Sequence, residues 1–185
     1  MILYHIILKF FLLKVKCRKE RKLMKKFLSL LLAAVMLFGL TSCMEATPKD
    51  FTCEGMTVTL TNRFQEANYE GYTVCYQSSD IIVIVLKESF SLQAGLDQMA
   101  LDEYANLVLQ ANASKSPSEI TKHEKFQSIE YTFLNEQENQ TYAYFTTMFK
   151  GTDAFWMIQF ASKEEDYASH KDTFMEFANS VKFAQ

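Results

Sequence analysis

The sequence predicts an α+β domain built on a mostly antiparallel sheet with two main amphipathic helices. Three long strands, 126–134, 141–149 and 154–161, are separated by short polar turns, and such turns join antiparallel neighbours. Large apolar side chains occupy both alternating positions of these strands, so both faces of the sheet need cover. Segments 96–111 and 167–181 repeat apolar residues at three- and four-residue steps, which is typical of amphipathic helices.

Shorter strands precede the first helix. Segments 51–53 and 56–60 flank a turn that contains glycine, which predicts a hairpin. Segment 62–68 is compatible with a helical turn. Segment 72–77 alternates in polarity, and 81–86 is a continuous β-branched run, typical of a strand buried on both faces.

A capping box predicts where the last helix begins. In the run 162–165 (SKEE), Ser162 is placed to accept a hydrogen bond from the backbone N–H of Glu165. After this helix, the tail 181–183 is expected to pack back onto the sheet.

Composition and charge narrow the class of protein. The chain has 185 residues, 49% hydrophobic and 14% aromatic, which argues against disorder. Residues 1–42 hold nine Lys/Arg and one acid, giving +8, whereas residues 43–185 hold ten Lys/Arg and 21 acids, giving −11. Because nucleic-acid binding requires clustered Lys/Arg, this acidic body is expected to bind no nucleic acid.

Residues 24–42 have the organisation of a signal peptide. Lys25 and Lys26 precede an uncharged apolar run, 27–40, of 14 residues. A membrane-spanning helix needs roughly 20 such residues, whereas a signal-peptide core is shorter. We therefore expect this segment to direct export of the rest of the chain.

The four residues Leu40, Thr41, Ser42 and Cys43 resemble the bacterial lipobox. The resemblance implies that the Cys43 thiol receives a diacylglycerol and that cleavage follows directly before it. Two acyl chains hold a protein stably on a membrane, whereas one chain binds marginally. The chain is thus predicted to be lipid-anchored through Cys43 at the extracytoplasmic face of the cell membrane.

Residues 1–23 fit this scheme badly, because their apolar part is broken by charges and 17–22 is strongly basic. They could be a long positive region of the signal peptide, a first membrane segment, or an untranslated stretch. We favour the last, with Met24 as the start, since Lys19–Lys22 can be encoded by a purine-only ribosome-binding site. Beyond the signal peptide, 43–50 is predicted to be a lipidated tether and 51–185 one domain.

Several segments between residues 51 and 183 resemble the PsbP/Mog1-like proteins, in particular small bacterial lipoproteins of that type. They are the strand 81–88 with the Ser89-Phe90 that follows it, the helix start 101–104, and the segments 142–145, 153–160 and 178–183. The resemblance implies an α/β/α sandwich with a central, mostly antiparallel sheet. The family's known roles are non-enzymatic: support of a photosynthetic complex, and binding of a nuclear transport GTPase. Neither partner is implied here, and no binding residue transfers.

No catalytic, metal-binding or nucleotide-binding motif occurs in the sequence. His123 and His170 each lack a second ligand at metal-binding spacing, so both are interpreted as surface histidines. The acids 164–166 suit the first turn of a helix, and Glu136 with Glu138 suits a solvated turn. We expect no enzyme activity, no cofactor and no metal.

Aromatic residues and cysteines supply the remaining candidates. Tyr142, Tyr144, Phe155 and Trp156 could form a binding platform, but aromatics at alternating strand positions usually belong to a core. Trp156 is assigned to the core, and Phe155 is kept as a candidate partner-binding residue.

Cys53 and Cys75 are either a disulfide, which would contribute roughly 3 kcal/mol, or two free thiols in the sheet, the alternative we favour.

The resulting prediction is a non-catalytic binding or accessory protein of the cell envelope, with an envelope protein as partner. The alternative is an envelope hydrolase or a lipoprotein that binds a small ligand. An exposed apolar or aromatic patch would favour the first, and a deep pocket with converging polar groups would favour the second.

Overall fold

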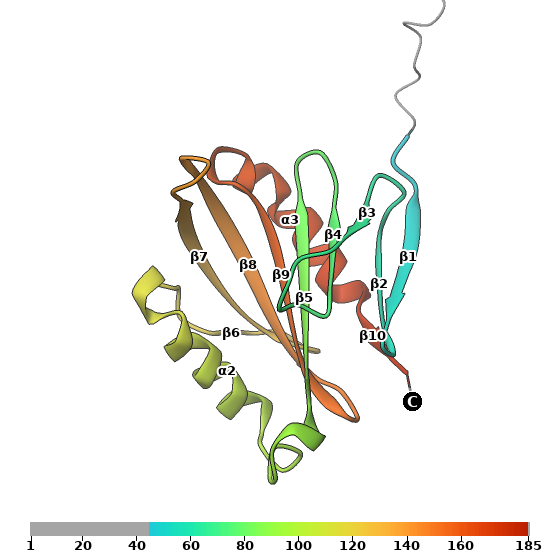
Figure 1. Cartoon of the computed structure of the whole chain (residues 1–185), viewed down its shortest axis with the longest axis vertical. Helices are drawn as coiled ribbons and strands as arrows, with labels where there is room; N and C mark the ends of the chain where they lie inside the picture. Colours follow the sequence, from blue (N-terminus) through green and yellow to red (C-terminus); the bar gives the residue numbers. More distant parts are fainter. Residues whose placement is uncertain (1–44, 185) are drawn as a thin grey trace, which may run out of the picture. The chain divides into compact units, whose positions relative to one another are not determined.

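The computed structural model describes residues 45–184, and the predicted signal peptide and lipobox lie outside this range. A seven-stranded sheet has the order β3-β4-β5-β9-β8-β7-β6, and a three-stranded sheet has the order β1-β2-β10 (Figure 1). The large sheet consists of β3 (Gln65–Ala67), β4 (Val74–Gln77), β5 (Ile82–Ser89), β6 (Thr121–Lys122), β7 (Gln127–Asn135), β8 (Gln140–Lys150) and β9 (Ala154–Lys163). The small sheet consists of β1 (Pro48–Cys53), β2 (Met56–Thr61) and β10 (Lys182–Phe183).

The meander of three long strands is confirmed, since β7 pairs with β8 and β8 with β9, both antiparallel. Asn139 adopts a left-handed backbone conformation in the first connecting turn, at φ 49°. Asn135 Oδ1 accepts hydrogen bonds from the backbone N–H groups of Gln137 (3.1 Å) and Glu138 (3.4 Å). Asparagine suits both roles, because it tolerates positive φ and its side chain bonds to nearby backbone.

Helix α3 (Glu164–Ser180) covers one face of the large sheet. Phe174, Phe177 and Ala178 are buried against the sheet in a core that includes Val83 and Phe160. In Figure 1 this helix runs behind β5 and β9.

The predicted capping box at the start of α3 is wrong. The helix begins at Glu164 with Lys163 as its N-cap, and the Ser162 hydroxyl donates to the Lys163 carbonyl instead of capping the helix. The reason is tertiary: β9 stays paired with β8 as far as Lys163, opposite Tyr142. Ser162 is therefore part of the strand.

Helix α2 (Leu101–Ala111) packs on the opposite face, so the two helices sandwich the sheet as predicted. Its buried residues are Tyr104, Ala105 and Val108. They form a second hydrophobic core with residues of the sheet, namely Ile129, Tyr131, Met148 and Phe155. None of the helices within residues 45–184 is long and apolar enough to span a membrane.

The first helix begins later than predicted. Segment 93–100 forms turns, and α2 starts at Leu101, where the Glu103 carboxylate accepts a hydrogen bond from the Ala100 N–H (3.0 Å). The Lys150 ammonium donates to the carbonyls of Asp97 and Met99, at 2.8 Å each. These two contacts from β8 hold the segment directly before α2 in a non-helical conformation.

The N-terminal hairpin is confirmed, and it extends further back than predicted. Glu54 and Gly55 both have positive φ, at 47° and 90°, which matches the twist of a tight hairpin turn. β1 begins at Pro48, within the predicted tether, and the Asp50 carboxylate accepts a hydrogen bond from the Thr59 hydroxyl (2.6 Å). The helical turn expected over 62–68 is wrong, because this segment contains β3, which pairs with β4.

Candidate binding groove

Helix α2 is too short to cover its whole sheet face. α2 and β8 each have 11 residues, but a helix rises about 1.5 Å per residue and a strand about 3.3 Å. The helix covers the part of the sheet near Ile129, Met148 and Phe155. In Figure 1 it lies beside the lower part of the sheet, away from the β4–β5 and β7–β8 turns. The other half of this face is left without a helix.

The register of the strands creates a hollow in that half. Ala161 of β9 pairs with Ile82 of β5 on one side and Tyr144 of β8 on the other, and directly paired residues point to the same face. Ile82 and Tyr144 therefore lie on the same face, on either side of the small Ala161 side chain. A further pair, Tyr142 and Phe133, extends the same surface towards the β7–β8 turn.

We call the resulting cavity the tyrosine groove. Its volume is about 260 Å³, and its lining residues are Tyr69, Tyr72, Ile82, Ile84, Phe133, Asn135, Glu138, Tyr142 and Tyr144. Tyr69 and Tyr72 come from the segment between β3 and β4 and are each 43% exposed, while Phe133 is 47% exposed. Large aromatic side chains exposed together mark an interaction surface more often than isolated ones do.

Hydrogen bonds and ring contacts fix the walls of the groove. The Tyr142 hydroxyl donates to the Glu138 carboxylate (2.8 Å), and the Tyr69 hydroxyl donates to Gln77 Oε1 (3.2 Å). The Tyr144 ring stacks on Tyr131, with centroids 5.0 Å apart. Burial raises the pKa of Tyr144 to about 12, and the hydrogen bond to Glu138 raises the pKa of Tyr142. Both phenols are therefore neutral at physiological pH.

A buried polar network lies under the same face. Gln159 Nε2 donates to the Tyr131 hydroxyl oxygen (2.7 Å) and lies 3.5 Å from Thr146 Oγ1. Burial raises the pKa of Tyr131, so its hydroxyl stays protonated. Satisfied buried networks of this kind restrict side-chain motion, and this one supports the Tyr131–Tyr144 stack from below.

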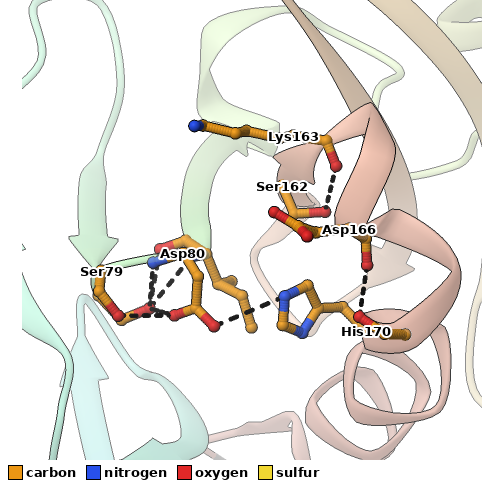
Figure 2. A network of polar contacts seen from close by, with 9 residues as sticks. Ser79, Asp80, Ser162, Lys163, Asp166 and His170 are labelled. Atoms are coloured by element: carbon orange, nitrogen blue, oxygen red, sulfur yellow. Dashed lines mark hydrogen bonds and ion pairs between the residues drawn. The ribbon is translucent and has the colours of Figure 1, made fainter.

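A second cavity of about 160 Å³ adjoins the groove and shares Ile82 and Tyr142 with it. Figure 2 shows the polar contacts beside it, which join the β4–β5 turn to α3. The Asp80 carboxylate accepts from the hydroxyls of Ser78 and Ser79, at 3.0 Å each, and His170 Nε2 lies 3.5 Å from its other oxygen.

The contacts around Asp80 differ from those of a catalytic serine, whose hydroxyl donates its hydrogen bond to a neighbouring histidine. Ser78 and Ser79 direct their protons to Asp80 and not to the imidazole of His170, which stacks on Phe174. The network instead connects the β4–β5 turn to α3, beside the cavity that adjoins the groove.

The other histidine contacts a serine inside the sheet. His123 Nε2 lies 2.9 Å from Ser128 Oγ, and burial lowers the pKa of His123. Ser128 is only 3% exposed, so its hydroxyl is closed to a substrate in solution. Within the described range 45–184, no three His, Cys, Asp or Glu residues are grouped to hold a metal ion.

Of the four aromatic residues that the sequence suggested as a binding platform, two line the groove and two are buried in the core. Tyr142 and Tyr144 line the groove, whereas Trp156 is in the core, as predicted. Phe155 has no exposed surface, since it stacks on Tyr104 (4.2 Å between centroids) under α2. This corrects the expectation that Phe155 contacts a partner, because the helix covers that part of the face.

Cys53 and Cys75 are free thiols in the structure, Cys53 partly buried and Cys75 fully buried. Burial raises the pKa of both, which favours the protonated form. Leu40, Thr41, Ser42 and Cys43 lie outside the described residues, so the lipobox stays a prediction.

Sequence reasoning missed Tyr69, Tyr72 and Glu138 as groove residues. The two tyrosines lie between strands where no periodicity applies, and Glu138 resembles any solvated turn residue. Only the strand order β4-β5-β9-β8 brings them to one surface. The one available signal was the spacing of Tyr142 and Tyr144, which places both on the same face of a strand.

Comparisons with known proteins concern the fold. A solution structure of cyanobacterial PsbP from Synechocystis aligns with 78% of this chain and 99% of its own, at 11% identity and a TM-score of 0.50. A crystal structure from Bacteroides thetaiotaomicron aligns with 77% of this chain, at 11% identity and a TM-score of 0.50, and the match spans half of that protein's chain. The Ran-binding protein Mog1p of Saccharomyces cerevisiae aligns with 76% of this chain and 97% of its own, at 9% identity and a TM-score of 0.48.

No family model matches the chain, and no curated protein matches it in sequence. The PsbP-like α+β fold implied by the sequence resemblance is nevertheless confirmed by the first two structures.

Proposed function

We propose that this protein is a lipid-anchored, non-catalytic binding protein of a bacterial cell envelope, and that the tyrosine groove is its binding site. The observation that carries the proposal is the half of the sheet face that α2 leaves uncovered, with Tyr69, Tyr72 and Phe133 exposed around a hollow. A folded domain gains stability by burying aromatic rings. A group of them left exposed around a hollow supports a role in binding a ligand or a protein partner.

The groove is a better candidate for binding than for catalysis. Its lining is mostly aromatic and aliphatic, and its polar members, apart from tyrosine hydroxyls, are Asn135 and Glu138. Hydrolysis of a glycoside uses two carboxyl groups that face each other across the bond, whereas this lining contains one. The resemblance to PsbP/Mog1-like proteins, whose known roles are non-enzymatic, supports the same interpretation.

Lipid attachment at Cys43 would place the groove at the membrane surface, on the extracytoplasmic side. β1 begins at Pro48, so only a few residues separate the proposed lipid from the folded domain. The domain would be held close to the bilayer, and its partner is expected among envelope components. The negative charge of residues 43–185 agrees with export of this part, because positive residues are retained in the cytoplasm.

Replacing Cys43 by alanine is expected to release the protein from the membrane fraction or to stop its processing, because the thiol that carries the lipid is lost. Fractionation and mass spectrometry of the protein from its native membrane measure this. Ser42→Ala is the control, since it keeps a small residue in the lipobox and should leave the protein on the membrane. An unmodified Cys43, or a peptide from residues 1–23, would contradict the anchor or the start at Met24, respectively.

A photoreactive phenylalanine analogue at Tyr72 is expected to form a specific adduct when the full chain is irradiated in its native membrane. The matched control carries the same analogue at Leu107, which is 50% exposed on α2 and outside the groove. Intact mass and peptide mapping identify the adduct. Equal labelling at both positions, or none at Tyr72, would show that the groove is not the binding site.

A further inference from the structure

The lining of the tyrosine groove includes one carboxyl group, that of Glu138, and no Lys, Arg or His. Glu138 lines the groove, accepts one hydrogen bond from Tyr142, and makes no ion pair within the described residues. A carboxylate has about four acceptor positions on its two oxygens, so most of its capacity is open to a ligand. Residues 43–185 carry −11, and this field attracts cations and repels anions.

The rest of the wall also suits a cation. Tyr69, Tyr72, Tyr142 and Tyr144 contribute four aromatic rings, and the face of an aromatic ring carries partial negative charge. Such rings bind ammonium groups, and cages of aromatic residues recognise quaternary ammonium ions in particular. Alkyl groups on the nitrogen replace N–H groups that bind water. The free-energy cost of desolvation is therefore lower for an alkylated ammonium than for a simple one when it enters an apolar cavity.

The same sheet face already holds an ammonium group on aromatic rings. Lys115 Nζ lies 4.6 Å from the ring centroid of Tyr131 and 5.5 Å from that of Phe133, and it donates to Asn112 Oδ1 (2.9 Å). Phe133 belongs to the groove lining, whereas Lys115 does not. A residue of the groove lining therefore already contacts an ammonium group that is not itself part of the lining.

The size of the cavity limits the ligand. Its volume of about 260 Å³ is below the range of roughly 300–1,000 Å³ found for sites that enclose drug-sized molecules. A compact head group fits this space better than an extended molecule does.

We propose that the tyrosine groove binds an organic cation with an alkylated ammonium group, held by the four tyrosine rings and the Glu138 carboxylate. The inference rests on the proposed function, in which this groove is the binding site. The cation is either a free small molecule or the methylated side chain of a lysine on a protein, and both present the same chemistry to the groove.

The test is a titration of the full chain, in a non-ionic detergent, with three probes followed by NMR of the tyrosine rings. The neutral control is the dimethylbutanol isomer in which a carbon atom replaces the quaternary nitrogen of choline. Choline is expected to bind at least tenfold more tightly than this dimethylbutanol, because only choline carries the charge. A short trimethyllysine peptide distinguishes the source: tighter binding than choline indicates a protein side chain, and weaker binding indicates a free molecule. Either order supports the cation site.

Two variants and a control identify the residues involved. Glu138→Gln and Tyr72→Leu are each expected to weaken choline binding about fivefold to tenfold, and Glu138→Gln should leave dimethylbutanol binding unchanged. Glu136→Gln removes the same charge from the same turn but outside the groove lining, and it should have little effect.

Equal binding of choline and dimethylbutanol, equal effects of the two glutamate variants, or no choline binding at millimolar concentration would overturn the cation site. The adduct at Tyr72 would still report on the groove itself, so the two proposals fail separately.

Discussion

Phe155→Ala is expected to lower the free energy of unfolding by about 3–5 kcal/mol, the range for phenylalanine truncations in a packed core. Phe155 is fully buried between the sheet and α2, stacked on Tyr104 and edge-on to Phe90 with centroids 5.3 Å apart. The Lys150 ammonium, which fixes the segment before α2, also lies 5.6 Å from the Phe155 ring centroid. Loss of the ring therefore removes a fully buried contact between the sheet and Tyr104 of α2. Chemical denaturation followed by circular dichroism measures the change.

Phe133→Ala provides the matched control, because it makes the same truncation on the same sheet face at a residue that is 47% exposed. Its expected cost is no more than about 1 kcal/mol, since little buried surface is lost. Similar losses for the two variants would contradict the assignment of Phe155 to the core and of Phe133 to the groove.

Raising the pH is expected to unfold the protein cooperatively between about pH 10 and pH 12. Burial raises the pKa of Tyr76 to about 12, with smaller contributions from Cys53 and Glu66, and burial likewise raises the pKa of Tyr144 to about 12. Tyr104 and Tyr167 are raised by burial and by their hydrogen bonds to Glu88 and Glu130.

Stability is expected to fall as the pH rises, because the pKa values of these tyrosines are higher in the folded chain than in the unfolded chain. An unfolded tyrosine releases its proton near pH 10, whereas the folded protein keeps these protons to higher pH. The stability that depends on them is therefore complete below about pH 10 and is lost as the pH rises through the folded pKa values.

Tyrosinate absorbance and circular dichroism, recorded together against pH, measure this transition. Tyr76→Phe should make the loss of stability less steep, and Tyr69→Phe, at an exposed ring, should leave the profile unchanged. Release of all tyrosine protons near pH 10 from a chain that keeps its native circular dichroism would contradict the expectation.

Local patterns in the sequence predicted most of the secondary structure and little of the site. The hairpin at Glu54–Gly55 and the meander of β7, β8 and β9 follow from turn residues and alternation, which act over a few positions. The predicted ends of both helices were wrong at the N-terminus, because Lys163 is held by strand pairing and segment 93–100 by the Lys150 ammonium. Both of these contacts come from residues distant in sequence.

The sequence by itself determined that this chain forms an antiparallel sheet with amphipathic helices, since periodicity is a property of neighbouring residues. It also determined that the faces of the sheet are rich in aromatic side chains. Only the tertiary structure decided which of these aromatics are buried. Phe155 and Tyr144 point to the same face, but α2 covers Phe155, whereas Tyr144 is only partly buried and lines the groove. The physical reason is length: a helix of 11 residues spans about half the distance of an 11-residue strand, so half of the face stays open as the groove.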